Sequence, residues 1–228
     1  MGQMSSTRDK RRLLHRGAPD DPAKFARAFL EARLSGFEKD MHICLQGIQS
    51  KDRPGLTHAY FPALMNCCGM LEYLAGLYVG RINGLGKKDV IAYAKYLPQP
   101  DYNDDVIRVL FDAFRNAIAH RGIASGVWVD PHPGMQTRRL TWKVMADTAR
   151  PALEVLADQS EIKFDSPWPC PYTHRVHIHL GRLWRDIRDS VEGYVDELVT
   201  SQDLQNKFMK CMKRLYPVDF DHQKSKKI

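Results

Sequence analysis

The sequence lacks the cysteine spacings that mark disulfide frameworks and thiolate metal sites. Its five cysteines are odd in number, include no C-x-x-C pair and mostly lie in apolar helical patterns. The first 16 residues are charged throughout and contain no apolar stretch, so they do not resemble a secretory signal. These absences predict a protein of the reducing cytoplasm.

The sequence also lacks the short motifs of several common enzyme classes. It contains no G-x-S-x-G motif, no P-loop and no obvious carboxylate cluster for a metal ion. Hydrolases that use a nucleophilic serine and P-loop nucleotide triphosphatases therefore have no support. We expect neither a metal nor a cofactor.

The body of the chain carries no net positive charge, although the whole chain has a formal charge of +7. Residues 1–16 have a net charge of +4 and residues 223–228 add +3, which leaves residues 17–222 neutral. Basic ends of this kind attract a polyanion such as RNA or simply solubilise the chain, and the second role is favoured. We expect a basic N-terminal tail over residues 1–20, one domain over 21–217 and a basic C-terminal tail over 218–228.

Apolar residues spaced three and four apart predict a mainly α-helical fold. The first long amphipathic helix should begin at Asp20-Asp21-Pro22, because aspartate caps a helix and proline suits its first turn. Further helices are expected over 88–97, 104–121 and 183–198, and from about 201 to 215. Together they predict an antiparallel helical bundle.

The stretch Ala59 to Val79 is apolar on nearly all sides and has the length of a membrane span. Pro62, Asn66 and Glu72 interrupt it, however, and no second span accompanies it. We therefore interpret it as a central buried helix and expect no membrane association.

A β-rich insertion is predicted at about 123–180, after the helix over 104–121. Alternating apolar residues at 127–129 and 140–144 flank the turn Pro131-His132-Pro133-Gly134, which is typical of two strands. Short strands are also expected around 153–156, 162–164 and 176–180.

The helix over 104–121 ends in the polar segment Arg115-Asn116-Ala117-Ile118-Ala119-His120, which Arg121 and Gly122 follow. On a helix that turns about 100° per residue, Asp112, Asn116 and His120 fall on the side opposite the apolar stripe. Arg108 and Arg115 share one flank of that helix. The cluster should therefore point away from the core and need a second surface, such as another copy of the chain, to become a pocket.

The alternative is an ordinary solvated face, on which Asp112 would pair with Arg115 or Arg108. From the spacing alone, such a solvated face is favoured over a reactive site.

These residues resemble the R-x4–6-H signature of the HEPN superfamily, and Asn116 matches the polar residue that often follows its arginine. The resemblance covers about residues 22–122 and 180–216, and the insertion between them has no counterpart in the minimal bundle. It implies a HEPN-like helical bundle that forms a homodimer, with the motifs of two protomers in one cleft. Many such proteins are metal-independent endoribonucleases, and a toxin or defence effector with a cognate antitoxin is the implied setting.

The resemblance also implies roles for individual residues. Arg115 would hold the scissile phosphate of RNA, and His120 would transfer a proton to or from the reacting oxygens. Asn116 would orient His120 or a phosphate oxygen, while Arg108 and Arg121 would bind substrate. The alternative within the same fold is a non-catalytic module that binds a nucleotide or a partner protein.

Two other groups of side chains admit a functional interpretation. His177 and His179 would share one face of a strand in the H-x-H arrangement of some metal sites, but a polar strand face is favoured. The four tryptophans could stack on bases, yet Trp142 and Trp184 lie in apolar patterns that favour core packing.

Overall fold

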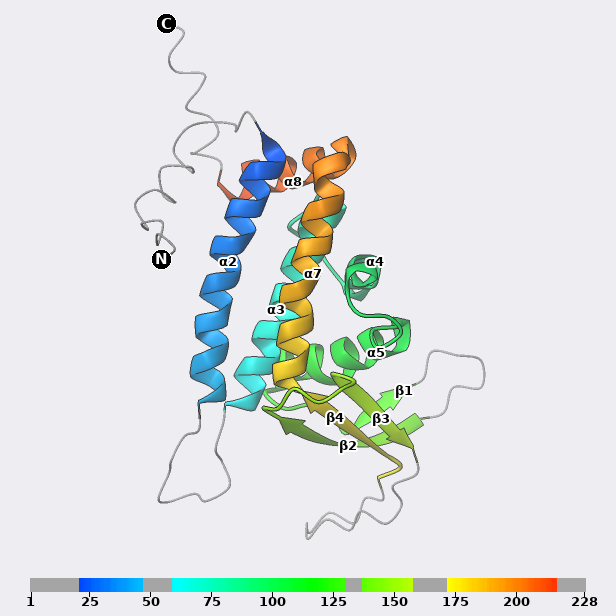
Figure 1. Cartoon of the computed structure of the whole chain (residues 1–228). Coiled ribbons are helices and arrows are strands. Elements are labelled where there is room, and N and C mark those ends of the chain that lie inside the picture. The colour runs from blue at the N-terminus through cyan, green and yellow to red at the C-terminus, as the bar shows by residue number, and fades with distance from the viewer. Residues whose placement is uncertain (1–20, 47–58, 130–136, 158–171, 217–228) are drawn as a thin grey trace, which may run out of the picture.

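The computed structural model describes residues 21–46, 59–129, 137–157 and 172–216. Helices dominate this part of the chain, and a small four-stranded sheet lies at one end of the long helices (Figure 1). The predicted mainly α class, with a β-rich segment after the motif-bearing helix, is therefore confirmed. The two predicted tails, the strand at 162–164, the turn at 131–134, Trp168 and Cys170 lie outside the described residues.

Three long helices lie side by side: α2 (Pro22–Leu45), α3 (Tyr60–Val79) and α7 (Leu180–Thr200). The shorter α8 (Gln202–Leu215) lies across one end of them (Figure 1). Asp21 caps α2 by accepting a hydrogen bond from the Lys24 backbone N–H at 2.9 Å, as the sequence predicts. α2 runs opposite to α3 and α7, which run in the same direction (Figure 1). The bundle is thus only partly antiparallel, because the chain crosses the sheet before α7 begins.

α3 is the central buried helix, as predicted. Leu71 and Leu74 are fully buried, and so are the adjacent Cys67 and Cys68. Within the described ranges, no helix has both the length and the apolar character that crossing a bilayer requires.

The sheet has the strand order β1-β2-β4-β3, with bounds Val127–Val129 (β1), Thr137–Met145 (β2), Leu153–Ala157 (β3) and His174–His179 (β4). β2 pairs antiparallel with β1 and parallel with β4, which pairs antiparallel with β3. The strand predicted at 176–180 is β4, which begins two residues earlier and ends where α7 starts. The sheet packs its inner face on the helices through contacts such as that between Trp142 and Phe114, whose ring centroids lie 6.4 Å apart.

Two other tryptophans are also in the core. Trp184 of α7 stacks on Phe37 of α2, with centroids 6.2 Å apart, and Trp128 of β1 is 5% exposed. The core interpretation of Trp142 and Trp184 is therefore confirmed, although Trp142 is only partly buried where it packs against the core.

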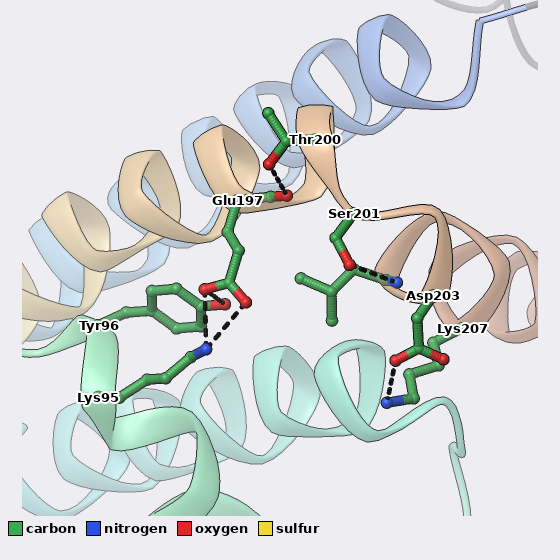
Figure 2. Close-up of polar contacts among 8 residues, drawn as sticks. Lys95, Tyr96, Glu197, Thr200, Ser201, Asp203 and Lys207 are labelled. Atoms are coloured by element: carbon green, nitrogen blue, oxygen red, sulfur yellow. Dashed lines mark hydrogen bonds and ion pairs between the residues drawn. The ribbon is translucent and has the colours of Figure 1, made fainter.

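The connection between α3 and the motif-bearing helix is fastened to α7. It contains α4 (Lys87–Tyr93) and the 3-10 turn η1 (Ala94–Tyr96). Figure 2 shows Glu197 of α7 accepting hydrogen bonds from Lys95 and Tyr96 of η1, each at 2.8 Å. These contacts hold the connection against the bundle on the way to the motif.

A buried polar cluster fixes the chain just before that motif-bearing helix. Asp186 of α7 is 1% exposed and accepts a hydrogen bond from the Tyr102 hydroxyl at 2.9 Å and one from Arg182 Nε at 3.0 Å. Because each polar group in the cluster has a partner, its burial is tolerated. The start of the next helix therefore has a fixed position relative to α7.

Candidate functional site

The candidate motif lies at the end of a helix that sits between α3 and the sheet (Figure 1). This helix starts with α5 (Asp104–Val109), which Asn103 caps by accepting from the Val106 backbone N–H at 3.0 Å. It ends with α6 (Asn116–Arg121), after which Gly122 adopts the left-handed conformation with φ of 73°. Both ends agree with the sequence, since asparagine is a good N-cap and glycine accepts positive φ at little cost.

The middle of the helix is not α-helical, which corrects the prediction of one regular helix over 104–121. Residues Leu110–Arg115 form a π-helical segment, η2, and the Asn116 backbone N–H bonds to the carbonyl of Phe111. A π turn holds about one residue more than an α turn, so residues after it are rotated by about 100° relative to those before it. Arg108 and Arg115 therefore do not share the flank that a regular helix would give them.

Packing explains why the sequence pattern misses this turn. Residues buried around η2 include Phe111 and Ala113 as well as the predicted Leu110 and Phe114, so the helix contacts neighbours on more than one side. A regular amphipathic helix would bury a single apolar stripe. Here a second side of the helix is also buried, and the residues that cover it come from distant parts of the chain. Such π turns occur often at functional sites.

Arg115 is held by two neighbours. Its Nη2 donates to Glu72 Oε2 at 2.8 Å, and its Nη1 donates to Asn116 Oδ1 at 3.0 Å. The side chains of Arg115 and Glu72 are 29% and 18% exposed. Arg115 therefore turns toward α3, which corrects the prediction that the whole polar cluster points away from the core.

The solvated-face alternative requires Asp112 to pair with Arg108 or Arg115, but Asp112 pairs with neither. It accepts a hydrogen bond from Lys87 Nζ of α4 at 2.5 Å. Asp112 and Arg115 thus bind separate partners on separate helices, and the carboxylate nearest to Arg115 is that of Glu72.

Glu72 was not identified as a site residue from the sequence. It is the sole charged residue in α3, a helix that is otherwise mostly apolar. A carboxylate in such a helix requires a partner, because burying an unpaired charge is costly. That signal is visible in the sequence, but the identity of the partner is not.

Cys68 lies beside the Arg115–Glu72 pair. Burial of its thiol, together with the nearby negative charge of Glu72, raises the pKa of Cys68 to about 12. The thiol therefore stays protonated near neutral pH and is unsuited to act as a nucleophile.

His120 and Arg121 occupy the last turn of α6, and both are exposed. Asn116 and His120 are four residues apart within α6, so their side chains are neighbours on its surface. The motif thus combines a half-buried, fixed guanidinium with an exposed imidazole about one turn further on.

The chemical capacity of this arrangement follows from its groups. A guanidinium carries five N–H donors, and the two hydrogen bonds of Arg115 leave three for an anionic ligand. The planar fork matches phosphate geometry, and imidazole exchanges protons near neutral pH. The motif therefore carries one group that can bind a phosphate and another that can move a proton.

The second histidine group lies on β4. His179 binds Asp147 through Nδ1, a partner that spacing in the sequence does not reveal. Burial and the nearby Arg175 lower the pKa of His177, which disfavours its charged form. Across the described residues, no three histidine, cysteine or acidic side chains come together in a way that could hold a metal ion.

No protein-family model, curated protein sequence or solved structure matches this chain.

Proposed function

We propose that this protein is a metal-independent endoribonuclease of the HEPN type. The observation that carries the proposal is the Arg115 guanidinium, fixed by Glu72 and Asn116 at the end of a helix whose last turn exposes His120. Cleavage by an internal hydroxyl requires an orientated phosphate-binding group and a proton-transfer group at the same phosphate.

In the proposed reaction the RNA itself supplies the nucleophile. The ribose 2′-oxygen attacks the adjacent phosphorus and loses its proton, while the bond from phosphorus to the 5′-oxygen breaks and that oxygen gains a proton. His120 takes up or delivers one of these protons. Arg115 stabilises the negative charge that grows on the phosphate oxygens, and Asn116 orients Arg115 through its side-chain oxygen. The products are a 2′,3′-cyclic phosphate and a 5′-hydroxyl.

A second protomer completes the site in this proposal. α2, α3, α7, α8 and the motif-bearing helix form the HEPN-like bundle, and the exposed His120 and Arg121 face a second copy across a two-fold axis. The proposed setting is a cytoplasmic toxin or defence effector that a cognate antitoxin protein restrains.

The experiment for this proposal compares purified wild-type protein with His120→Ala on a labelled single-stranded RNA. His120 is exposed and has no hydrogen-bond partner among the described residues, so the substitution should leave the fold intact. We expect loss of cleavage with an unchanged melting temperature. Cleavage at the wild-type rate by His120→Ala would refute the proposed role.

One observation favours the alternative of a non-catalytic module. Glu72 already neutralises Arg115, and residues 17–222 carry no net charge, so the protein lacks the basic enrichment of a long RNA track. A module of this kind would bind a nucleotide or a partner protein at the same site without changing it. RNA that stays intact while binding with an affinity sensitive to Arg115→Ala would support that alternative.

A further inference from the structure

The pairing of Glu72 with Arg115 joins two helices that the sequence keeps 43 positions apart. Glu72 is the only charged residue of α3, and its side chain is 18% exposed. Ion pairs at the surface hold a guanidinium weakly, whereas a partly buried pair with a second hydrogen bond holds it in one orientation. The second bond comes from Asn116, at 3.0 Å on the other terminal nitrogen of Arg115.

We propose that Glu72 is a positioning residue, which fixes the Arg115 guanidinium in the orientation that meets the reacting phosphate. This inference rests on the proposed function, because it assigns to Glu72 a part in the same reaction. Glu72 touches neither RNA nor the reacting atoms; it acts through Arg115.

The two contacts restrain the guanidinium in a way that one contact would not. Glu72 binds Nη2 and Asn116 binds Nη1, so rotation about the terminal bonds of Arg115 would break at least one hydrogen bond. The remaining donors consequently keep a constant direction before substrate arrives. Orientation that exists before binding lowers the barrier of the chemical step.

The charge of Glu72 has the opposite effect on the binding of RNA. Its carboxylate cancels part of the positive charge of Arg115, so it weakens the attraction of the site for phosphate in the ground state. Removing the carboxylate should therefore slow cleavage without weakening the binding of RNA. A residue with a purely structural role would not separate these two quantities.

The experiment measures cleavage and binding separately in full-length Glu72→Ala and Glu72→Gln. Single-turnover rates are taken with an unmodified RNA, and dissociation constants with the same sequence carrying 2′-O-methyl groups, which cannot react. We expect Glu72→Ala to cleave at least about tenfold more slowly and to bind the methylated RNA as tightly as the wild type or more tightly. Glu72→Gln should recover much of the rate, because its amide oxygen can still accept a hydrogen bond from Arg115.

The matched control is Asp112→Asn. Asp112 lies on the motif-bearing helix and pairs with Lys87 instead of Arg115, so this variant removes one negative charge near the site without releasing the guanidinium. It should cleave at nearly the wild-type rate. A wild-type rate in Glu72→Ala, an equal loss in Asp112→Asn, or a parallel loss of rate and binding would each overturn the assignment.

A second readout keeps this inference separate from the proposed function. In a ¹⁵N-labelled sample, the Nε–H resonance of Arg115 should be shifted away from the position of free arginine in the wild type and in Glu72→Gln. In Glu72→Ala it should move to the position of free arginine. If the wild type cleaves no RNA, the proposed function fails, and this resonance still decides whether Glu72 fixes Arg115. An unchanged resonance in Glu72→Ala would refute the positioning role.

Discussion

The role of Arg115 depends on the planar shape of its guanidinium as much as on its charge. Its guanidinium binds Glu72 and Asn116 through separate nitrogens and still has donors for a ligand. A lysine ammonium carries the same charge as a point, without the planar fork that makes several parallel hydrogen bonds possible. Charge alone therefore does not describe what this position requires.

Arg115→Lys tests that requirement. We expect the variant to bind RNA with an affinity close to that of the wild type and to cleave it at least about tenfold more slowly, because one ammonium cannot satisfy Glu72, Asn116 and a phosphate in fixed geometry. Single-turnover cleavage and binding of a 2′-O-methyl RNA measure the two quantities. A wild-type rate in Arg115→Lys would mean that only the charge matters.

At the level of elements, the π-helical segment η2 determines which arginine side chains lie near the motif. It rotates α5 relative to α6, so Arg108 turns away from the flank of Arg115, while Arg121 stays beside His120 in the last turn of α6. The two arginines, both expected from the sequence to bind substrate, therefore differ in their relation to the site.

Arg121→Ala and Arg108→Ala should show this difference. We expect Arg121→Ala to weaken RNA binding and to lower the dependence of affinity on salt by about one charge, because it removes one phosphate contact. Arg108→Ala should change neither by a comparable amount. The measurement is the dissociation constant of a labelled RNA at several salt concentrations, and equal effects of the two variants would contradict the rotation argument.

Helix ends were predictable because they depend on neighbouring residues, as at Asp21 and Gly122. The π turn and the partner of Arg115 were not, because they depend on packing between segments that are far apart in the sequence. Glu72 left a trace as an isolated charge in α3, but only the folded structure assigns it to Arg115 and assigns Asp112 to Lys87.

At the scale of the whole molecule, Asp186 connects the bundle to the start of the motif-bearing helix. It is buried and binds both Tyr102 and Arg182. Removing its charge would leave the buried guanidinium of Arg182 without a counter-ion. The position of the motif relative to α7 depends on this cluster.

Asp186→Asn should therefore lower the free energy of unfolding by about 3 kcal/mol, the usual effect of breaking one side of a buried ion pair. Urea denaturation followed by circular dichroism measures it. Asp189→Asn is the control, because Asp189 forms an exposed pair with Arg188 whose loss should cost less than about 1 kcal/mol. Equal stabilities of the two variants would show that the buried cluster contributes little.

The proposed dimer makes a prediction for mixtures of inactive protomers. Arg115→Ala and His120→Ala should each be inactive alone, and unfolding and refolding them together should restore part of the RNA cleavage. Recovery is expected because a mixed dimer brings an intact Arg115 from one protomer to an intact His120 from the other. Absence of recovery, with mixed dimers present by mass spectrometry, would place each complete site within one protomer.

The most direct test of the central claim is cleavage of matched RNA and DNA oligonucleotides by the wild-type protein in the presence of a chelator. The account predicts that RNA is cut to products ending in a 2′,3′-cyclic phosphate, that DNA of the same sequence stays intact, and that the chelator changes neither result. It further predicts that a single 2′-deoxy substitution at the cleaved position stops the reaction there. Cleavage of the DNA, or loss of RNA cleavage when the chelator is added, would contradict the claim that Arg115 and His120 use the hydroxyl of the substrate itself.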